Sequence, residues 1–121
     1  MRTKQIALTL SALVAVYGCQ PKSDAPVSFK ADIAPIFSKH CLACHAEGGA
    51  GTRKSGLQLD SYENLMRGKV VTPGAISKSP LVTVILPTAD HTKSMPMRGE
   101  KLSKSQVELV ERWIAQGAKN N

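Results

Sequence analysis

The most regular pattern of apolar and polar positions lies near the C-terminal end of the chain. Ser103 and Gln106 have the spacing of a capping box, which marks the start of a helix. Gly117 is a typical stop signal. The pattern therefore predicts a helix from Ser103 to about Gln116 with one buried side. The residues expected on that side are Val107, Val110, Trp113 and Ile114.

A second helical pattern lies directly before Cys41. Asp32 can cap this helix, and Pro35 then falls in the first turn, where its missing N–H has no cost. A start at Ser28 would put Pro35 in the helix interior, which is disfavoured. We therefore expect the helix to begin near Asp32. Its expected inward residues are Ile33, Ile36, Phe37 and Cys41.

Two shorter helices are indicated in the middle of the chain. Asp60 or Ser61 can cap the first, which should end at Gly68. The Ser79-Pro80 pair predicts the second, over residues 80–86, although residues 82–86 could also form a strand. Between the Cys41 segment and these helices, residues 46–56 contain four glycines and are expected to form a loop. The patterns together predict an all-α fold with roughly three to five short helices.

The first 18 residues have the pattern of a signal peptide. Arg2 and Lys4 precede an apolar run, Ile6–Val16, that is too short for a membrane span, which needs about 20 residues. Val16-Tyr17-Gly18-Cys19 then resembles a bacterial lipobox, so Cys19 is expected to be acylated and to become the mature N-terminus. The alternative is ordinary cleavage after Gly18, which would leave Cys19 as an unpaired thiol in an oxidising compartment.

The remaining chain divides into a tether and one domain. Residues 19–28 contain Pro21 and Pro26 among small polar residues and are expected to form a lipid-anchored tether. Residues 29–121 are long enough for a single small domain. By resemblance to other lipoproteins, Gln20 in place of Asp suggests the outer membrane. The expected location is the periplasmic side of a bacterial membrane.

The chain is basic, with 16 Lys and Arg, 9 Asp and Glu, and a formal net charge of +7 at pH 7. Removal of Arg2 and Lys4 with the signal peptide leaves a mildly basic mature chain. No dense Lys/Arg stripe with interleaved aromatic residues is present in the sequence, so nucleic-acid binding is not expected. A basic surface instead favours acidic protein partners.

The segment Cys41-Leu42-Ala43-Cys44-His45 carries the chemistry. It reads C-x-x-C-H, the attachment motif of a c-type haem. Residues three and four apart are neighbours on a helix, so Cys41 and Cys44 can form thioethers with one porphyrin. His45 can then bind the iron as the proximal ligand.

Two other readings of the cysteine pair are possible. A thioredoxin-like redox motif would need a preceding strand and a βαβ setting, and the sequence predicts neither. A zinc site would need a second pair of ligands at metal spacing, for which only His40 and His91 remain.

With these motifs in order, the chain resembles the planctomycete-type c-type cytochrome domains, which are small mono-haem cytochromes c. The resemblance runs over nearly the whole mature length. Besides the haem motif, it is carried by Phe29, Asp32-Ile33, Pro35-Ile36-Phe37, Gly56-Leu57, Leu59-Asp60-Ser61-Tyr62, Gly68, Pro73-Gly74, Ser79, Leu81, Met95-Pro96, Leu102-Ser103, Trp113-Ile114 and Gly117-Ala118.

The resemblance implies a cytochrome c fold around one covalent haem c, with Met95 as the sixth iron ligand. One departure is Met97, which stands where many relatives have a second Pro. Met97 is therefore a second candidate for the sixth ligand, and His91 is a third. With both axial positions filled, the iron would exchange single electrons and catalyse no reaction on a substrate, so we expect an electron carrier and no enzyme.

Two alternatives remain from other classes of function. One is a haem sensor or peroxidase-like enzyme with an exchangeable sixth ligand, for which His91 is the candidate distal residue. The other is a haem-containing docking subunit of a larger oxidoreductase.

Overall fold

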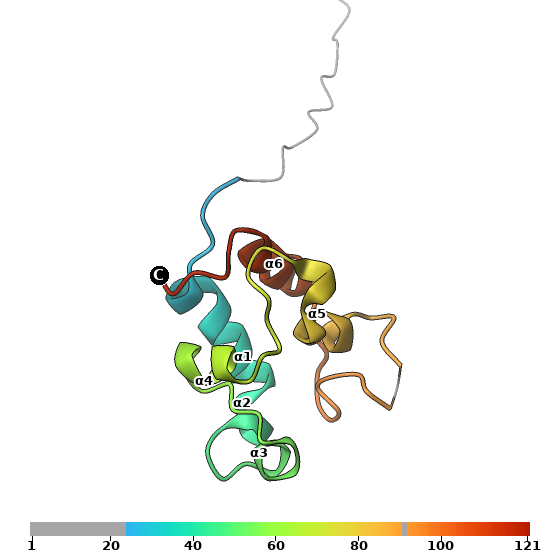
Figure 1. Cartoon of the computed structure of the whole chain (residues 1–121). Helices are drawn as coiled ribbons and strands as arrows, with labels where there is room; N and C mark the ends of the chain where they lie inside the picture. Colours follow the sequence, from blue (N-terminus) through green and yellow to red (C-terminus); the bar gives the residue numbers. More distant parts are fainter. Residues whose placement is uncertain (1–23, 91) are drawn as a thin grey trace, which may run out of the picture.

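The computed structural model describes residues 24–90 and 92–121. Within them the fold is all-α, as predicted, and no strand is present (Figure 1). The described residues form six α-helices, which is more than expected because two short helices, α2 and α3, follow Cys41. The elements in chain order are η1 (Phe29–Ile33), α1 (Ala34–His40), α2 (Leu42–His45), α3 (Ala50–Ser55), α4 (Tyr62–Arg67), η2 (Ile76–Lys78), α5 (Pro80–Ile85) and α6 (Lys104–Ala115).

The predicted signal peptide and Cys19 lie outside the described residues, as does His91. Among the residues that are described, no helix has the length and apolar character needed to cross a membrane.

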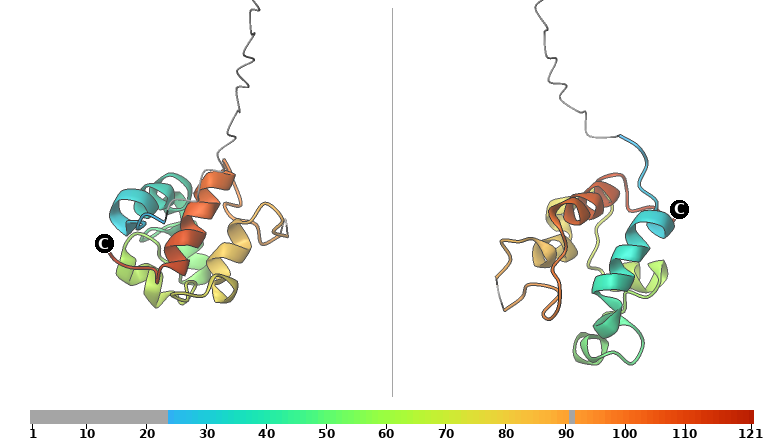
Figure 2. Two further views of the ribbon diagram at one scale, coloured as in Figure 1. Left: turned by 90° about the horizontal axis from the view of Figure 1, so that it is seen from above. Right: turned by 180° about the vertical axis from the view of Figure 1, so that it is seen from behind.

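An aromatic cluster centred on Phe29 joins the first helical turn, η1, to the last helix, α6. The Phe29 ring lies edge-on to the ring of Tyr62, with centroids 5.3 Å apart, and 5.5 Å from the ring of Trp113. The Phe37 ring completes the cluster at 6.5 Å. η1, α1, α4 and α6 thus meet around one ring, and Figure 2 shows α6 lying beside the N-terminal helix. Trp113 is fully buried where these elements meet.

The C-terminal helix α6 forms as the sequence predicts. The Ser103 hydroxyl accepts a hydrogen bond from the Gln106 N–H, and the Gln106 side chain accepts one from the Ser103 N–H, so the capping box is confirmed. The four apolar residues predicted on its inner side are all buried. The helix predicted after Ser79 is also confirmed as α5, and the strand alternative for residues 82–86 is wrong.

The α-helix α1 begins at Ala34, close to the predicted start near Asp32, but the prediction missed the π-helical turn η1 that precedes it, and Asp32 is not its N-cap. Ser28 caps a π-helical turn, accepting at its hydroxyl from the Ala31 N–H, while the Asp32 carboxylate accepts from the Ser28 N–H. In this turn the Ala34 N–H bonds the Phe29 carbonyl five residues back. Because the wide turn precedes α1, Pro35 still falls in the first turn of the α-helix, where no N–H is required.

The prediction of a loop over residues 46–56 is also wrong in part, because α3 forms inside it. Two of the glycines mark the ends of this helix. Gly49 is the N-cap, and Gly56 ends the helix with a positive φ of 75°. The Thr52 hydroxyl donates to the Ala46 carbonyl and fixes the helix to the turn before it.

The packed domain begins before residue 29. Val27 is buried, and its N–H donates to the Gln116 side-chain oxygen at 2.8 Å. Asn121 joins the other end of the chain to η1, since its carbonyl oxygen accepts from the Ser28 hydroxyl and the Lys30 N–H. The last residues of the expected tether are therefore part of the fold.

Candidate cofactor site

The continuous helical path of η1 and α1 ends at Cys41, which places the C-x-x-C-H segment at the end of a rigid element. The Cys41 N–H still bonds the Phe37 carbonyl at 2.8 Å. After this residue the chain turns into α2, where the N–H groups of Cys44 and His45 both bond the Cys41 carbonyl, at 3.1 and 2.9 Å. One helical turn thus carries all three predicted attachment and ligand residues.

The two thiols differ in their surroundings. Cys41 is partly buried against the hydrophobic core, whereas Cys44 is exposed, and neither forms a disulfide in the described residues. Burial raises the pKa of the Cys41 thiol from 9.0 to about 11, so this residue is a neutral thiol at neutral pH.

The imidazole of His45 is held in a defined orientation. Its Nδ1 lies 3.1 Å from the backbone carbonyl oxygen of Leu57. A carbonyl oxygen can only accept, so Nδ1 carries the proton and the lone pair lies on Nε2. A second hydrogen bond, from the Leu59 N–H to the His45 carbonyl at 2.8 Å, fixes the backbone of the same pair of segments. His45 can therefore present Nε2 to a metal ion.

Gly51 and Thr52 of α3 lie close to the His45 ring and to the Leu57 carbonyl to which it is bonded. A Cβ atom placed on Gly51 would lie 2.8 Å from Cε1 and 2.9 Å from Nε2 of His45, closer than real side chains pack. The Thr52 hydroxyl lies 3.0 Å from the same Leu57 carbonyl oxygen that accepts from His45. The helix α3, which the sequence did not predict, thus forms one wall of the imidazole pocket.

These residues fit a covalently bound haem c. Two thiols lie one helical turn apart. The adjacent His45 imidazole has Nδ1 engaged by the Leu57 carbonyl and Nε2 available for the iron. When bound, the haem would supply one-electron chemistry at its iron.

The structure separates the two methionines named as candidates for the sixth ligand. Met95 is partly buried and packs against the hydrophobic core, and its N–H donates to the Val84 carbonyl at 2.7 Å. Met97, two residues later, is 64% exposed. The other candidate, His91, lies outside the described residues.

His40 takes part in other contacts. Its Nδ1 lies 3.0 Å from the Glu100 carbonyl oxygen, and its Nε2 lies 3.3 Å from the Gln106 side-chain nitrogen. Within residues 24–90 and 92–121, no three or more His, Cys, Asp or Glu side chains are grouped so that they could hold a metal ion.

The Leu57 carbonyl and Gly51 were not identified as site residues from the sequence. A backbone carbonyl leaves no signature in a residue pattern, and Gly51 was one of several glycines in an expected loop. The signal that could have found Leu57 is the Gly56-Leu57 pair, which the family resemblance includes without assigning it a role.

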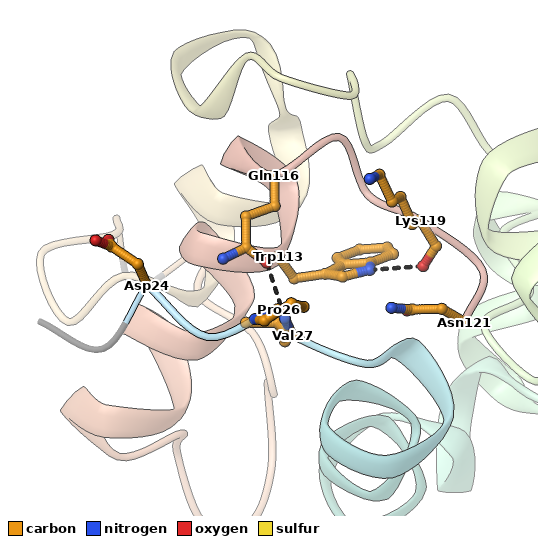
Figure 3. Close-up of a pocket in the computed structure, with 7 residues that line it drawn as sticks. All are labelled: Asp24, Pro26, Val27, Trp113, Gln116, Lys119 and Asn121. Atoms are coloured by element: carbon orange, nitrogen blue, oxygen red, sulfur yellow. Dashed lines mark hydrogen bonds between the residues drawn. The ribbon is translucent and has the colours of Figure 1, made fainter.

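A surface pocket of about 340 Å³ lies elsewhere in the fold (Figure 3). It is formed where the first described residues meet the end of α6, with Val27, Trp113 and Gln116 among its lining residues. The Trp113 indole N–H is already bonded to the Lys119 carbonyl, at 2.9 Å. This pocket lies at the N-terminal end of the η1–α1 path, whereas the C-x-x-C-H segment lies at its C-terminal end.

Comparison with known protein families gives a match to part of the chain. Residues 41–99 match the family model described as Planctomycete cytochrome C, a range that begins at Cys41 and includes Met95. No curated protein and no solved structure matches the chain. The match confirms the resemblance to planctomycete-type cytochrome c domains. Together with the helical fold, it indicates haem c binding and, in general terms, haem-based electron transfer.

Proposed function

We propose, from its resemblance to cytochrome c domains, that this protein is a mono-haem electron carrier which passes single electrons between periplasmic or membrane redox partners. The observation that carries the proposal is the geometry of His45. Its Nδ1–H is bonded to the Leu57 carbonyl, so Nε2 is the free ring nitrogen of the residue that directly follows Cys44 in α2. This is the arrangement needed for covalent attachment and proximal ligation by one helical turn.

Met95 is the proposed distal ligand. It is partly buried against the core, whereas the Met97 side chain is largely in solvent. A thioether from this partly buried side chain would complete the coordination of the iron and stabilise its reduced, less charged state. With no open coordination position, the centre would have no place for a substrate, and the protein would act as a carrier and not as an enzyme.

The proposed location follows from the N-terminal sequence. Export would bring the chain to the compartment in which c-type haem is attached, and acylation of Cys19 would hold it at the membrane. The partners proposed for it are redox proteins with an acidic docking surface, because the mature chain keeps a positive net charge.

Carbon monoxide binding to the reduced protein tests the carrier against the sensor or peroxidase-like alternative. A carrier whose sixth position is filled should bind the gas weakly and slowly, whereas Met95→Ala should bind it readily and serves as the positive control. Ready binding by the wild type would favour the alternative with an exchangeable ligand. Isolation of the protein in a stoichiometric complex would instead favour the docking-subunit alternative.

A further inference from the structure

Lys101 holds the backbone on both sides of Met95. Its Nζ donates to the Ser94 carbonyl at 3.3 Å and to the Pro96 carbonyl. Those two carbonyls belong to the residues immediately before and after Met95. One side chain from the stretch leading into α6 therefore spans the short segment that carries the proposed ligand.

The preceding residue, Glu100, connects this same stretch to α1. The Nδ1–H of His40 donates to the Glu100 backbone carbonyl at 3.0 Å, and the Lys39 ammonium lies 3.2 Å from the Glu100 carboxylate. The ion pair is largely exposed, so its contribution to stability is small. His40 directly precedes Cys41, so the connection ends next to the haem-attachment residue.

The second nitrogen of His40 faces α6. Because the Glu100 carbonyl requires a proton on Nδ1, Nε2 accepts from the Gln106 side-chain amide at 3.3 Å. The oxygen of that amide accepts from the Ser103 N–H at 2.8 Å as part of the capping box. His40 is thus bonded both to Glu100, the residue directly before Lys101, and to the start of α6.

We infer that Lys101 and His40 are positioning residues for the iron ligand. Residues 100–101 form a latch, with Glu100 attached to the end of α1 and Lys101 attached to the backbone around Met95. The latch holds the proposed distal ligand in register with α1, the helix that leads directly into the turn carrying the proximal ligand. The inference rests on the proposed ligation by His45 and Met95.

The latch has a measurable consequence for ligand exchange. An external ligand can reach the iron only when Met95 has left it, so its apparent affinity is its intrinsic affinity multiplied by the fraction of open molecules. Loss of the latch increases that fraction, because the segment around Met95 gains conformational freedom in the open state.

The test is a titration of the ferric holoprotein with imidazole. Lys101→Met removes the ammonium donor and keeps most of the side-chain length. It should raise the apparent affinity for imidazole roughly two- to ten-fold, as expected for the loss of the net stabilisation by about one hydrogen bond. Lys93→Met is the matched control, since it removes the same charge from the same loop. Among the described residues, the Lys93 side chain forms no hydrogen bond or ion pair. An equal rise in both variants would show a charge effect and would overturn the latch.

A second pair of variants tests the α1 side of the latch. His40→Asn keeps a side-chain N–H donor at a similar distance from the backbone, whereas His40→Leu removes it. The Leu variant should raise the imidazole affinity, and the Asn variant should remain closer to the wild type. Equal affinities for these two variants would exclude the bond to Glu100 from the latch.

The failure of the latch can be distinguished from the failure of the proposed ligation. If the ferric wild type lacks the weak near-infrared band of methionine–iron bonding, both proposals are overturned. If the band is present and the Lys101→Met variant has wild-type imidazole affinity, only the latch is wrong.

Discussion

The Nδ1 atom of His45 lies 3.1 Å from the carbonyl oxygen of Leu57, and this contact joins the haem-attachment turn to a segment 12 residues later. The Leu57 side chain packs so closely against Gly68 that a Cβ atom there would overlap with it. The acceptor is therefore fixed from α4 as well as by α3. An orienting partner of this kind sets the direction and the basicity of a metal-binding imidazole.

The first prediction concerns the wall of the imidazole pocket. Gly51→Ala should displace the His45 ring, because the new Cβ would lie under 3.0 Å from two ring atoms. We expect a loss of about 1–3 kcal/mol in the free energy of unfolding of the holoprotein, the usual cost of overpacking, and a changed reduction potential. Lys54→Ala, an exposed position on the same helix, is the control and should change stability by less than about 0.5 kcal/mol. Wild-type stability and potential in Gly51→Ala would show that the ring is not confined there.

The second prediction concerns covalent attachment. Replacing both Cys41 and Cys44 with Ser should abolish haem staining after denaturing electrophoresis, because no thioether can form. The variant should also be largely unfolded, since a small domain gains much of its stability from a tightly bound cofactor. Limited proteolysis measures this directly, and a haem-free variant that stays compact and protease-resistant would contradict the role of haem in completing the core.

The third prediction concerns the lipid anchor. The wild type should fractionate with membranes and incorporate labelled palmitate, and Cys19→Ala should block lipoprotein processing. A version with an ordinary signal peptide should be soluble in the periplasm. Unmodified mature protein free in the periplasm would argue against acylation and would leave the haem site unaffected.

The fourth prediction concerns docking. Electron transfer to an acidic partner should slow as salt is added, because charges are screened beyond about 8 Å at physiological ionic strength. Stopped-flow measurements over a range of salt concentrations would show this. A rate independent of salt would indicate an apolar contact, for which the exposed Met97 side chain is available, or a permanently bound partner.

Much of the fold could be predicted because its signals are local. The capping box at Ser103, the spacing of apolar residues in α6 and the Ser79-Pro80 pair each specify one helix by contacts within a few residues. The attachment residues were found for the same reason, since the C-x-x-C-H spacing is itself a helical turn.

The features that the sequence did not reveal depend on contacts between distant residues. The early start of the first helix is stabilised by Asn121, whose side-chain oxygen accepts from the Phe29 N–H. The helix α3 packs against the imidazole of His45, and the pairing of His40 with Glu100 links residues 60 apart. Such contacts use backbone carbonyls and glycine surfaces, which a pattern of apolar and polar residues does not record.

The proposed function depends on a covalent haem ligated by His45 and Met95. This ligation is tested by the optical spectrum of the protein expressed with its export signal and haem-attachment machinery. The reduced-minus-oxidised spectrum should be that of one c-type haem per chain, and the ferric form should show the weak near-infrared band of methionine ligation. Met95→Ala should lose this band and have a lower reduction potential. Met97→Ala should keep the band and the reduction potential of the wild type. Absence of covalent haem from the wild type would contradict attachment at Cys41 and Cys44. A band that persists in Met95→Ala and disappears in Met97→Ala would contradict ligation by Met95.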